Sequence, residues 1–203
     1  MPARTAPADG TGAAGRRRGP SLVWTAVDVA SMNLFLALLA LAALGGAGAV
    51  AFVGLGRGER LARLRADLGD AALPLALAVA ATCTAGSLYY SEVAGFTPCK
   101  LCWFQRICMY PLAVILLIGS VRRDEGVWKY AVAIAAIGLL FSLYHYQLEM
   151  FPEQKTFCTS AVPCSARLVN EFGFISLAFM AGAGFISVLA LAGARARARR
   201  IEE

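Results

Sequence analysis

Five long apolar stretches constrain this chain more than any other feature of its sequence. They lie near residues 33–56, 71–91, 103–121, 128–150 and 171–194. A helix of about 20 apolar residues spans the hydrocarbon core of a bilayer. Hydrophobic residues make up 59% of the 203 residues and charged residues only 16%, which is outside the range of ordinary soluble domains. The sequence therefore predicts an all-α integral membrane protein with five spans and no sizeable soluble domain.

The basic residues are concentrated in alternate segments between these stretches. One set comprises Arg57, Arg60, Arg63, Arg65, Arg122, Arg123, Lys129, Arg195, Arg197, Arg199 and Arg200. The opposite loops, 92–102 and 151–169, carry only Lys100, Lys155 and Arg167. The positive-inside rule places the first set in the cytoplasm and the two loops outside. The net charge of +6 is therefore a topology signal, and it does not indicate nucleic acid as a partner.

The N-terminal segment allows two interpretations. Five spans put the N-terminus outside, whereas Arg16, Arg17 and Arg18 before the first stretch favour the inside. In the second case 33–56 is a re-entrant hairpin or an incomplete crossing. The first apolar run begins too late and is too long for a cleavable signal peptide. Residues 1–31, rich in Ala, Gly, Pro and Arg, are predicted to be a disordered basic tail.

Four of the six cysteines fall in the two loops assigned to the outside, as the pairs Cys99/Cys102 and Cys158/Cys164. An oxidising compartment permits disulfides there, and both pairs face the same side, so they could meet. The other two, Cys83 and Cys108, lie within spans among small and apolar residues. We expect these two to behave as small buried hydrophobes without chemistry.

The Cys99/Cys102 pair has features that a purely structural disulfide does not need. Pro98 favours a chain break, so Cys102 is expected at the N-terminus of a helix, where backbone N–H groups and the helix dipole stabilise a thiolate. Arg106 follows one turn later and aims a positive charge back at this sulfur. The alternative for Arg106 is snorkelling to the headgroups. Gln105 is expected at a polar rim near the interface.

His145 and the Cys158/Cys164 pair each have a plain and a functional interpretation, whereas Glu149 has only a plain one. His145 lies near the outer end of the fourth stretch, either as a packed residue or as a group that donates to a bound electron acceptor or moves protons. Glu149 is expected to be a solvated helix end. The Cys158/Cys164 pair, in FCTSAVPCSAR, is expected in an exposed loop, either as a simple staple or as a disulfide that a soluble thiolate attacks.

The run CKLCWFQRICMYP resembles the signature of the disulfide bond formation protein B (DsbB) family, and CTSAVPC followed by NEFGFIS resembles its Gram-positive-type members called BdbC. The resemblance covers roughly residues 75–192. It implies a four-helix transmembrane bundle, to which the span near 33–56 is an addition. The implied organisation is an extra helix and cytoplasmic linker at 32–70, a DsbB-like domain at 71–194 and a basic cytoplasmic tail at 195–203.

The resemblance also implies a membrane oxidase that passes electrons from a DsbA/BdbD-like thioredoxin-fold dithiol protein to a quinone, either ubiquinone or menaquinone. Carried over to this chain, Cys158 is the point of attack and Cys164 the thiol released. Cys164 then exchanges with Cys99, and Cys102 faces the quinone. Arg106 matches the family arginine beside the quinone, while Gln105 and His145 are further candidates for contacts with it. No bound metal is implied.

Two other classes of protein fit the same residues. Four outward cysteines could form a tetrahedral zinc site, and a non-catalytic membrane scaffold could carry loops stapled by disulfides. Vitamin K epoxide reductase-type enzymes also couple loop cysteines to a CxxC pair and a quinone. In those enzymes the loop pair precedes the CxxC pair, and here the order is reversed, which favours the DsbB-like interpretation.

Overall fold

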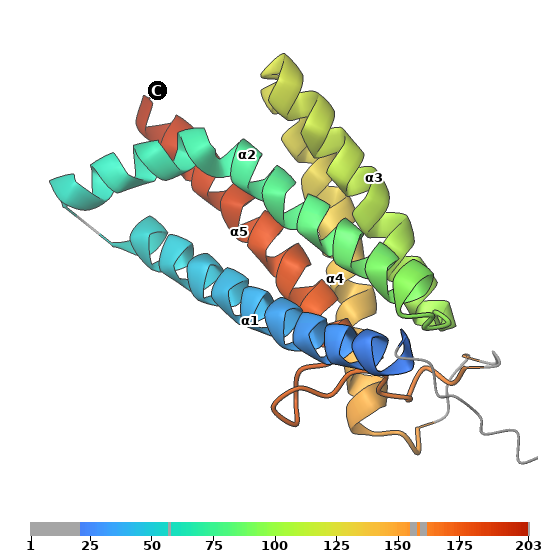
Figure 1. Ribbon diagram of the computed structural model, residues 1–203. Helices are drawn as coiled ribbons and strands as arrows, with labels where there is room; N and C mark the ends of the chain where they lie inside the picture. The colour runs from blue at the N-terminus through green and yellow to red at the C-terminus, as the bar shows by residue number, and fades with distance from the viewer. Residues whose placement is uncertain (1–20, 57, 155–157, 159–161, 203) are drawn as a thin grey trace, which may run out of the picture.

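Five long helices make up the computed structural model, which describes residues 21–56, 58–154, 158 and 162–202 (Figure 1). The helices are α1 (Ser21–Leu55), α2 (Glu59–Leu88), α3 (Lys100–Arg122), α4 (Trp128–Met150) and α5 (Leu177–Glu202). A π-helical turn, η1 (Tyr89–Val93), extends α2, and a 3-10 turn, η2 (Glu125–Val127), precedes α4. All five helices are long and apolar enough to cross a membrane. The predicted all-α, five-span architecture is confirmed.

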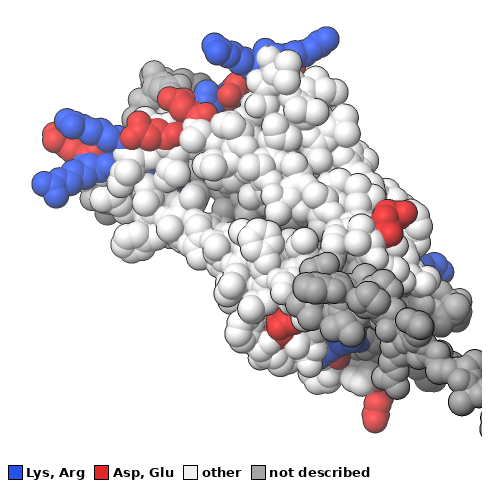
Figure 2. Space-filling view, in the orientation of Figure 1, with Lys and Arg blue, Asp and Glu red and all other residues white. Residues whose placement is uncertain are grey.

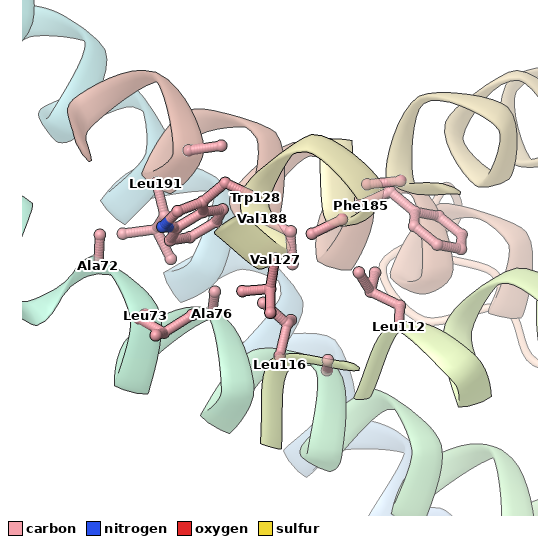
Figure 3. Close-up of a cluster of buried hydrophobic side chains, with 14 of the residues drawn as sticks. Ala72, Leu73, Ala76, Leu112, Leu116, Val127, Trp128, Phe185, Val188 and Leu191 are labelled. Atoms are coloured by element: carbon pink, nitrogen blue, oxygen red, sulfur yellow. The ribbon is translucent and has the colours of Figure 1, made fainter. Parts of the chain in front are cut away.

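The helices α2 to α5 close into a four-helix bundle. Around this ring α2 packs on α3, α3 on α4, α4 on α5, and α5 on α2. Apolar side chains fill the interior, among them the fully buried Leu112, Leu116, Phe185 and Val188 (Figure 3). Gly138 leaves room on α4 for the Phe185 ring, which a β-carbon would overlap. The additional helix α1 lies outside the ring and packs chiefly on α5.

Charged side chains gather toward the ends of the molecule, and an apolar band separates them (Figure 2). At one end Arg195 pairs with Asp70 and Glu125 at 3.1 Å each, which joins α5 to α2 and η2. The predicted outer loops meet at the opposite end, where Cys99 and Cys164 share one buried cluster. The two groups of loops therefore lie at opposite ends, as the charge pattern predicts.

The helix α1 is one continuous element, so the re-entrant hairpin proposed for 33–56 is wrong. It begins at Ser21, which places residues 21–31 in this helix; the remainder of the expected tail, 1–20, lies outside the described residues. The sequence of 21–31 contains neither Gly nor Pro, the residues that most strongly disfavour a helix. In the first half of α1, Asn33 Oδ1 accepts a hydrogen bond from the Tyr90 hydroxyl at 2.8 Å. The helix α1 therefore starts at the end of the bundle where the two cysteine pairs lie.

Two other boundaries differ from the sequence prediction. Residues 59–70, expected to be a linker, form the first turns of α2, because their Ala, Leu, Arg and Glu residues favour a helix. The last helix begins at Leu177 rather than 171. Gly173 adopts a positive φ of 80°, and the Ser176 hydroxyl accepts the Phe179 N–H at 3.2 Å, which caps the helix start. The helix α5 continues through the basic residues to Glu202.

Candidate active site

Cys99 and Cys102 lie at the start of α3 with their Sγ atoms 2.8 Å apart as free thiols. Cys99 is the N-cap residue, in an extended conformation directly after Pro98. Its sulfur accepts the backbone N–H of Cys102 at 3.3 Å. Cys102 lies in the first turn of α3, as expected, and its own N–H group is directed at the Cys99 sulfur. A small side-chain rotation would bring the two sulfurs to disulfide geometry.

The second cysteine pair is a disulfide, Cys158–Cys164, that packs against the first pair. Both half-cystines belong to the buried cluster that contains Cys99, Leu101 and Leu148. Cys158 is 8% exposed and Cys164 only 1%, so the expectation of an exposed disulfide is wrong. Cys164 is thus the more deeply buried of the two residues. The sequence could not predict this burial, because the residues that cover the loop come from α3 and α4.

His145 and Glu149 form a buried pair beside Cys99. His145 Nε2 lies 3.6 Å from Cys99 Sγ and 3.8 Å from Glu149 Oε1. Both residues are buried, and Glu149 is therefore not the solvated helix end that was expected. The i to i+4 spacing of the pair on α4 was visible in the sequence, but the packing that buries Glu149 was not. Among the described residues, neither His145 Nδ1 nor Glu149 Oε2 finds a hydrogen-bond partner.

The surroundings of Cys99, which lies just before the membrane-spanning part of α3, favour its thiolate. The hydrogen bond from the Cys102 thiol has the largest effect, and the bond with His145 acts in the same direction against the opposing effect of burial. Together they hold the pKa of Cys99 well below its ordinary value. The reduced pair therefore favours the thiolate at Cys99.

This assignment predicts an unusual titration of the reduced protein. The ultraviolet absorbance of the Cys99 thiolate should persist to a pH well below the pKa of an ordinary thiol, about 8.5, before it disappears. In His145→Leu the midpoint should rise by about one pH unit, because a hydrogen bond to the charged form is lost. Cys99→Ala should remove the signal and so assign it. A wild-type midpoint near that of an ordinary thiol would contradict the assignment.

An apolar cavity of about 370 Å³ opens beside Cys102, between α1, α2, α3 and α5. Cys102, Gln105 and Arg106, on one face of α3, are among the polar residues in its wall. A volume of this size lies within the range of small-molecule pockets, which are typically apolar with a few polar groups. Neither Cys99 nor His145 is among the described residues that line the cavity. His145 therefore contacts Cys99 and is not part of the cavity wall.

Arg106 is fixed at the cavity wall by two contacts. Its Nη2 donates to the Ser87 carbonyl oxygen at 2.8 Å, and its guanidinium lies 5.6 Å from the centre of the Trp103 ring. Tyr110 donates to the Ser87 hydroxyl at 3.2 Å and so braces the same turn of α2. These contacts hold the guanidinium group of Arg106 beside the cavity. No sequence pattern pointed to Ser87, because a backbone acceptor on another helix leaves none.

Gln105 and Cys83 differ from expectation in their placement, whereas Cys108 does not. Gln105 is buried and donates to the Ser142 hydroxyl at 3.1 Å, so it is not part of an interfacial rim. Cys108 is buried in the apolar core, as expected. Cys83 lines the cavity, a position that its apolar sequence context did not predict.

The geometry also bears on the zinc interpretation. A zinc site with four cysteine ligands needs four thiolates, and Cys158 and Cys164 are joined in a disulfide. The ligand atoms of Cys99, Cys102 and His145 lie within 4.8 Å of one another. This proximity is compatible with thiol chemistry as well as with metal binding, so it does not favour the zinc interpretation.

Comparison of the sequence with known proteins finds one matching family model and several similar proteins. The family model "Disulfide bond formation protein DsbB" matches residues 70–194. A probable disulfide formation protein of Oceanobacillus iheyensis is 44% identical over 110 residues, which cover 53% of this chain and 76% of the relative. The disulfide bond formation protein C of Bacillus subtilis is 45% identical over 106 residues, which cover 51% of this chain and 77% of that protein. No solved structure matches the chain significantly.

Proposed function

Because the chain belongs to the DsbB family of disulfide bond formation proteins, we propose that this multi-pass bacterial membrane protein is a thiol:quinone oxidoreductase. It oxidises an extracytoplasmic DsbA/BdbD-like thioredoxin-fold dithiol protein and passes the electrons to a membrane quinone. One observation carries the proposal: a disulfide, a dithiol and an apolar cavity lie in series at one end of the bundle. A stapled scaffold would need neither the dithiol nor the cavity.

The first exchange involves the loop disulfide. A partner thiolate attacks Cys158, a bond forms between the two proteins, the Cys158–Cys164 bond breaks, and Cys164 leaves as a thiolate. Cys158 is the more exposed of the two residues, at 8% against 1%, which supports this choice of target. The partner's second thiolate then attacks the mixed disulfide and leaves Cys158 as a thiolate while the partner becomes oxidised.

The second exchange moves the electrons inward. Starting from a Cys99–Cys102 disulfide, the Cys164 thiolate attacks Cys99 and releases Cys102 as a thiolate. Cys158 then attacks Cys164, which restores the loop disulfide and leaves Cys99 reduced. Two thiols have been oxidised in the partner and two formed in the protein, so the electrons balance. The observed state, with a loop disulfide and free Cys99 and Cys102, corresponds to the end of this exchange.

The residues around Cys99 and Cys102 have separate tasks in this scheme. His145, with its Nε2 atom 3.6 Å from Cys99 Sγ, stabilises the Cys99 thiolate and can hold a proton for it. Arg106 supplies a fixed positive charge at the wall where Cys102 is exposed to the cavity. In a low-dielectric site such a preorganised charge stabilises negative charge strongly. The cavity keeps water away from Cys102 because most of its lining is apolar.

The described residues fit a quinone head. Apolar walls would accept the ring, and Arg106 retains N–H donors beyond the one bound to Ser87, while Gln105 offers an amide in the same wall. A quinone bound there would accept two electrons and two protons and so allow the Cys99–Cys102 disulfide to form again. For a two-electron couple, ~30 mV of potential difference corresponds to about 1.4 kcal/mol.

Quinone reduction by the purified full-length protein tests this function. In detergent, with a reduced thioredoxin-fold dithiol protein as donor, we expect one quinone reduced per partner disulfide formed. In Arg106→Gln, kcat/KM for the quinone should fall about 10²-fold, since a charge that stabilises the thiolate and the reduced acceptor is lost. The exchange between partner and loop disulfide should not change.

Arg122→Gln is the matched control, because Arg122 lies at the opposite end of the same helix and is exposed. Its activity should stay within about twofold of wild type. If wild type reduces neither ubiquinone nor menaquinone analogues with several dithiol donors, the proposed function is wrong. Equal losses in the two arginine variants would refute the role of Arg106 alone.

A further inference from the structure

The cavity beside Cys102 has a wall that the family domain does not supply. The family match begins at residue 70, within α2, whereas α1 ends at Leu55. Leu36, Leu39, Ala40 and Ala43 of α1 nevertheless line the cavity together with Cys102 and Arg106. Their spacing of three or four residues places them on one face of the helix. We propose that α1 determines which quinone heads the cavity admits.

The helix α1 is held against the bundle at several levels, so this wall has a fixed position. Near one end Asn33 Oδ1 accepts the Tyr90 hydroxyl at 2.8 Å, and near the other Arg65 Nε donates to the Val53 carbonyl oxygen at 2.8 Å. Between them, the Ser187 hydroxyl lies 3.2 Å from the Ala43 carbonyl oxygen. The last contact joins α1 to α5 at the height of the cavity.

Close packing supports the same conclusion. Gly86 of α2 faces Leu36, and a β-carbon at Gly86 would approach the Leu36 side chain to 3.2 Å. The two helices therefore meet without a gap beside the cavity. Displacing α1 to accommodate a larger ligand would disturb these contacts, because packed helices transmit strain.

The size of the α1 side chains sets the space for a ring. Ala43 and Ala42 each present only a methyl group, whereas leucine would add an isopropyl group to the cavity wall. A fused bicyclic naphthoquinone extends further than a single-ring benzoquinone. We therefore infer that small residues on α1 admit the second ring of a naphthoquinone, and that larger ones exclude it first.

This inference rests on the proposed function, and a binding measurement separates the two. The probes are 2,3-dimethyl-1,4-naphthoquinone and tetramethyl-1,4-benzoquinone, which carry no ring hydrogen beside the carbonyls and so do not add to thiols. Equilibrium dialysis of the full-length protein in detergent gives Kd for each without turnover. In Ala43→Leu, Kd for the naphthoquinone should rise at least about tenfold and Kd for the benzoquinone less than about threefold.

Ala42→Leu provides a second variant if Ala43→Leu does not fold, because Ala42 lines the cavity at an exposed position that tolerates a larger side chain. Ala49→Leu is the matched control: the residue is exposed on the same helix and is not among those lining the cavity. Its two Kd values should equal those of wild type.

The outcomes are distinct. If wild type binds both probes and the ratio of their Kd values does not change in a folded Ala43→Leu or Ala42→Leu, the role of α1 is refuted while the proposed function stands. A ratio change of the same size in Ala49→Leu would also refute it. If wild type binds neither probe and reduces no quinone, the proposed function fails and the inference falls with it.

Discussion

Replacing Cys102 by alanine is expected to abolish quinone reduction, with a loss of at least about 10³-fold. The Cys102 side chain lines the cavity, whereas Cys99 is not among the described lining residues. Without Cys102, no disulfide can form at the start of α3, so the reduced loop cysteines cannot pass their electrons on to the quinone. The rate of quinone reduction with a reduced dithiol partner measures the effect.

The same variant should still react with the partner. The Cys158–Cys164 disulfide does not depend on Cys102, so a single turnover should convert it to two thiols, which a thiol-alkylating mass label detects. Cys108→Ala is the matched control, because Cys108 is a free cysteine on the same helix, buried in the core. Its turnover should remain within about twofold of wild type. Substantial turnover in Cys102→Ala would place another group on the electron path.

Cys164→Ala is expected to lose turnover to a similar extent and, in addition, to trap the partner. The remaining Cys158 thiolate can attack the disulfide of an oxidised thioredoxin-fold protein, which forms a mixed disulfide and frees one partner thiol. No Cys164 is present to complete an exchange with Cys99. Non-reducing electrophoresis of the full-length variant, mixed with oxidised partner, should show a covalent complex that a reductant dissolves.

Cys158→Ala is the contrasting variant. Cys164 is only 1% exposed and lies against Cys99, so it should form little or no mixed disulfide with the partner. Turnover should be lost in both variants, and only the trapping should differ. If Cys158→Ala traps the partner as efficiently as Cys164→Ala, the proposed order of attack is wrong. The melting temperature of each variant shows whether loss of the loop disulfide has disturbed the fold.

The membrane architecture was predictable because its signals are local. Each span is a run of apolar residues, and the charge of each connecting segment can be counted without knowing any distance. The errors arose at helix ends. The fifth helix begins at Leu177 instead of 171 because a positive φ at Gly173 and a cap by Ser176 decide its start. The first helix extends back to Ser21, into a stretch judged only by its composition.

The proximity of the candidate site residues was predictable in part, but not all of their contacts were. The spacing CKLCWFQR indicates which residues share a helix start, and the structure places Cys102 and Arg106 at one cavity wall. The same spacing could not show that Cys99, as the N-cap residue, accepts the N–H of Cys102. His145 contacts Cys99 instead of the cavity because the two residues approach across α3 and α4.

By itself the sequence determined that the protein crosses a membrane five times and brings two cysteine pairs to one end, since hydropathy, charge and residue spacing act along the chain. Only the tertiary structure decided that the loop disulfide is buried, that the His145–Glu149 pair is buried beside Cys99, and that α1 forms a wall of the cavity. Each of these depends on distances between residues far apart in the chain. Helix packing sets such distances, and no single segment encodes them.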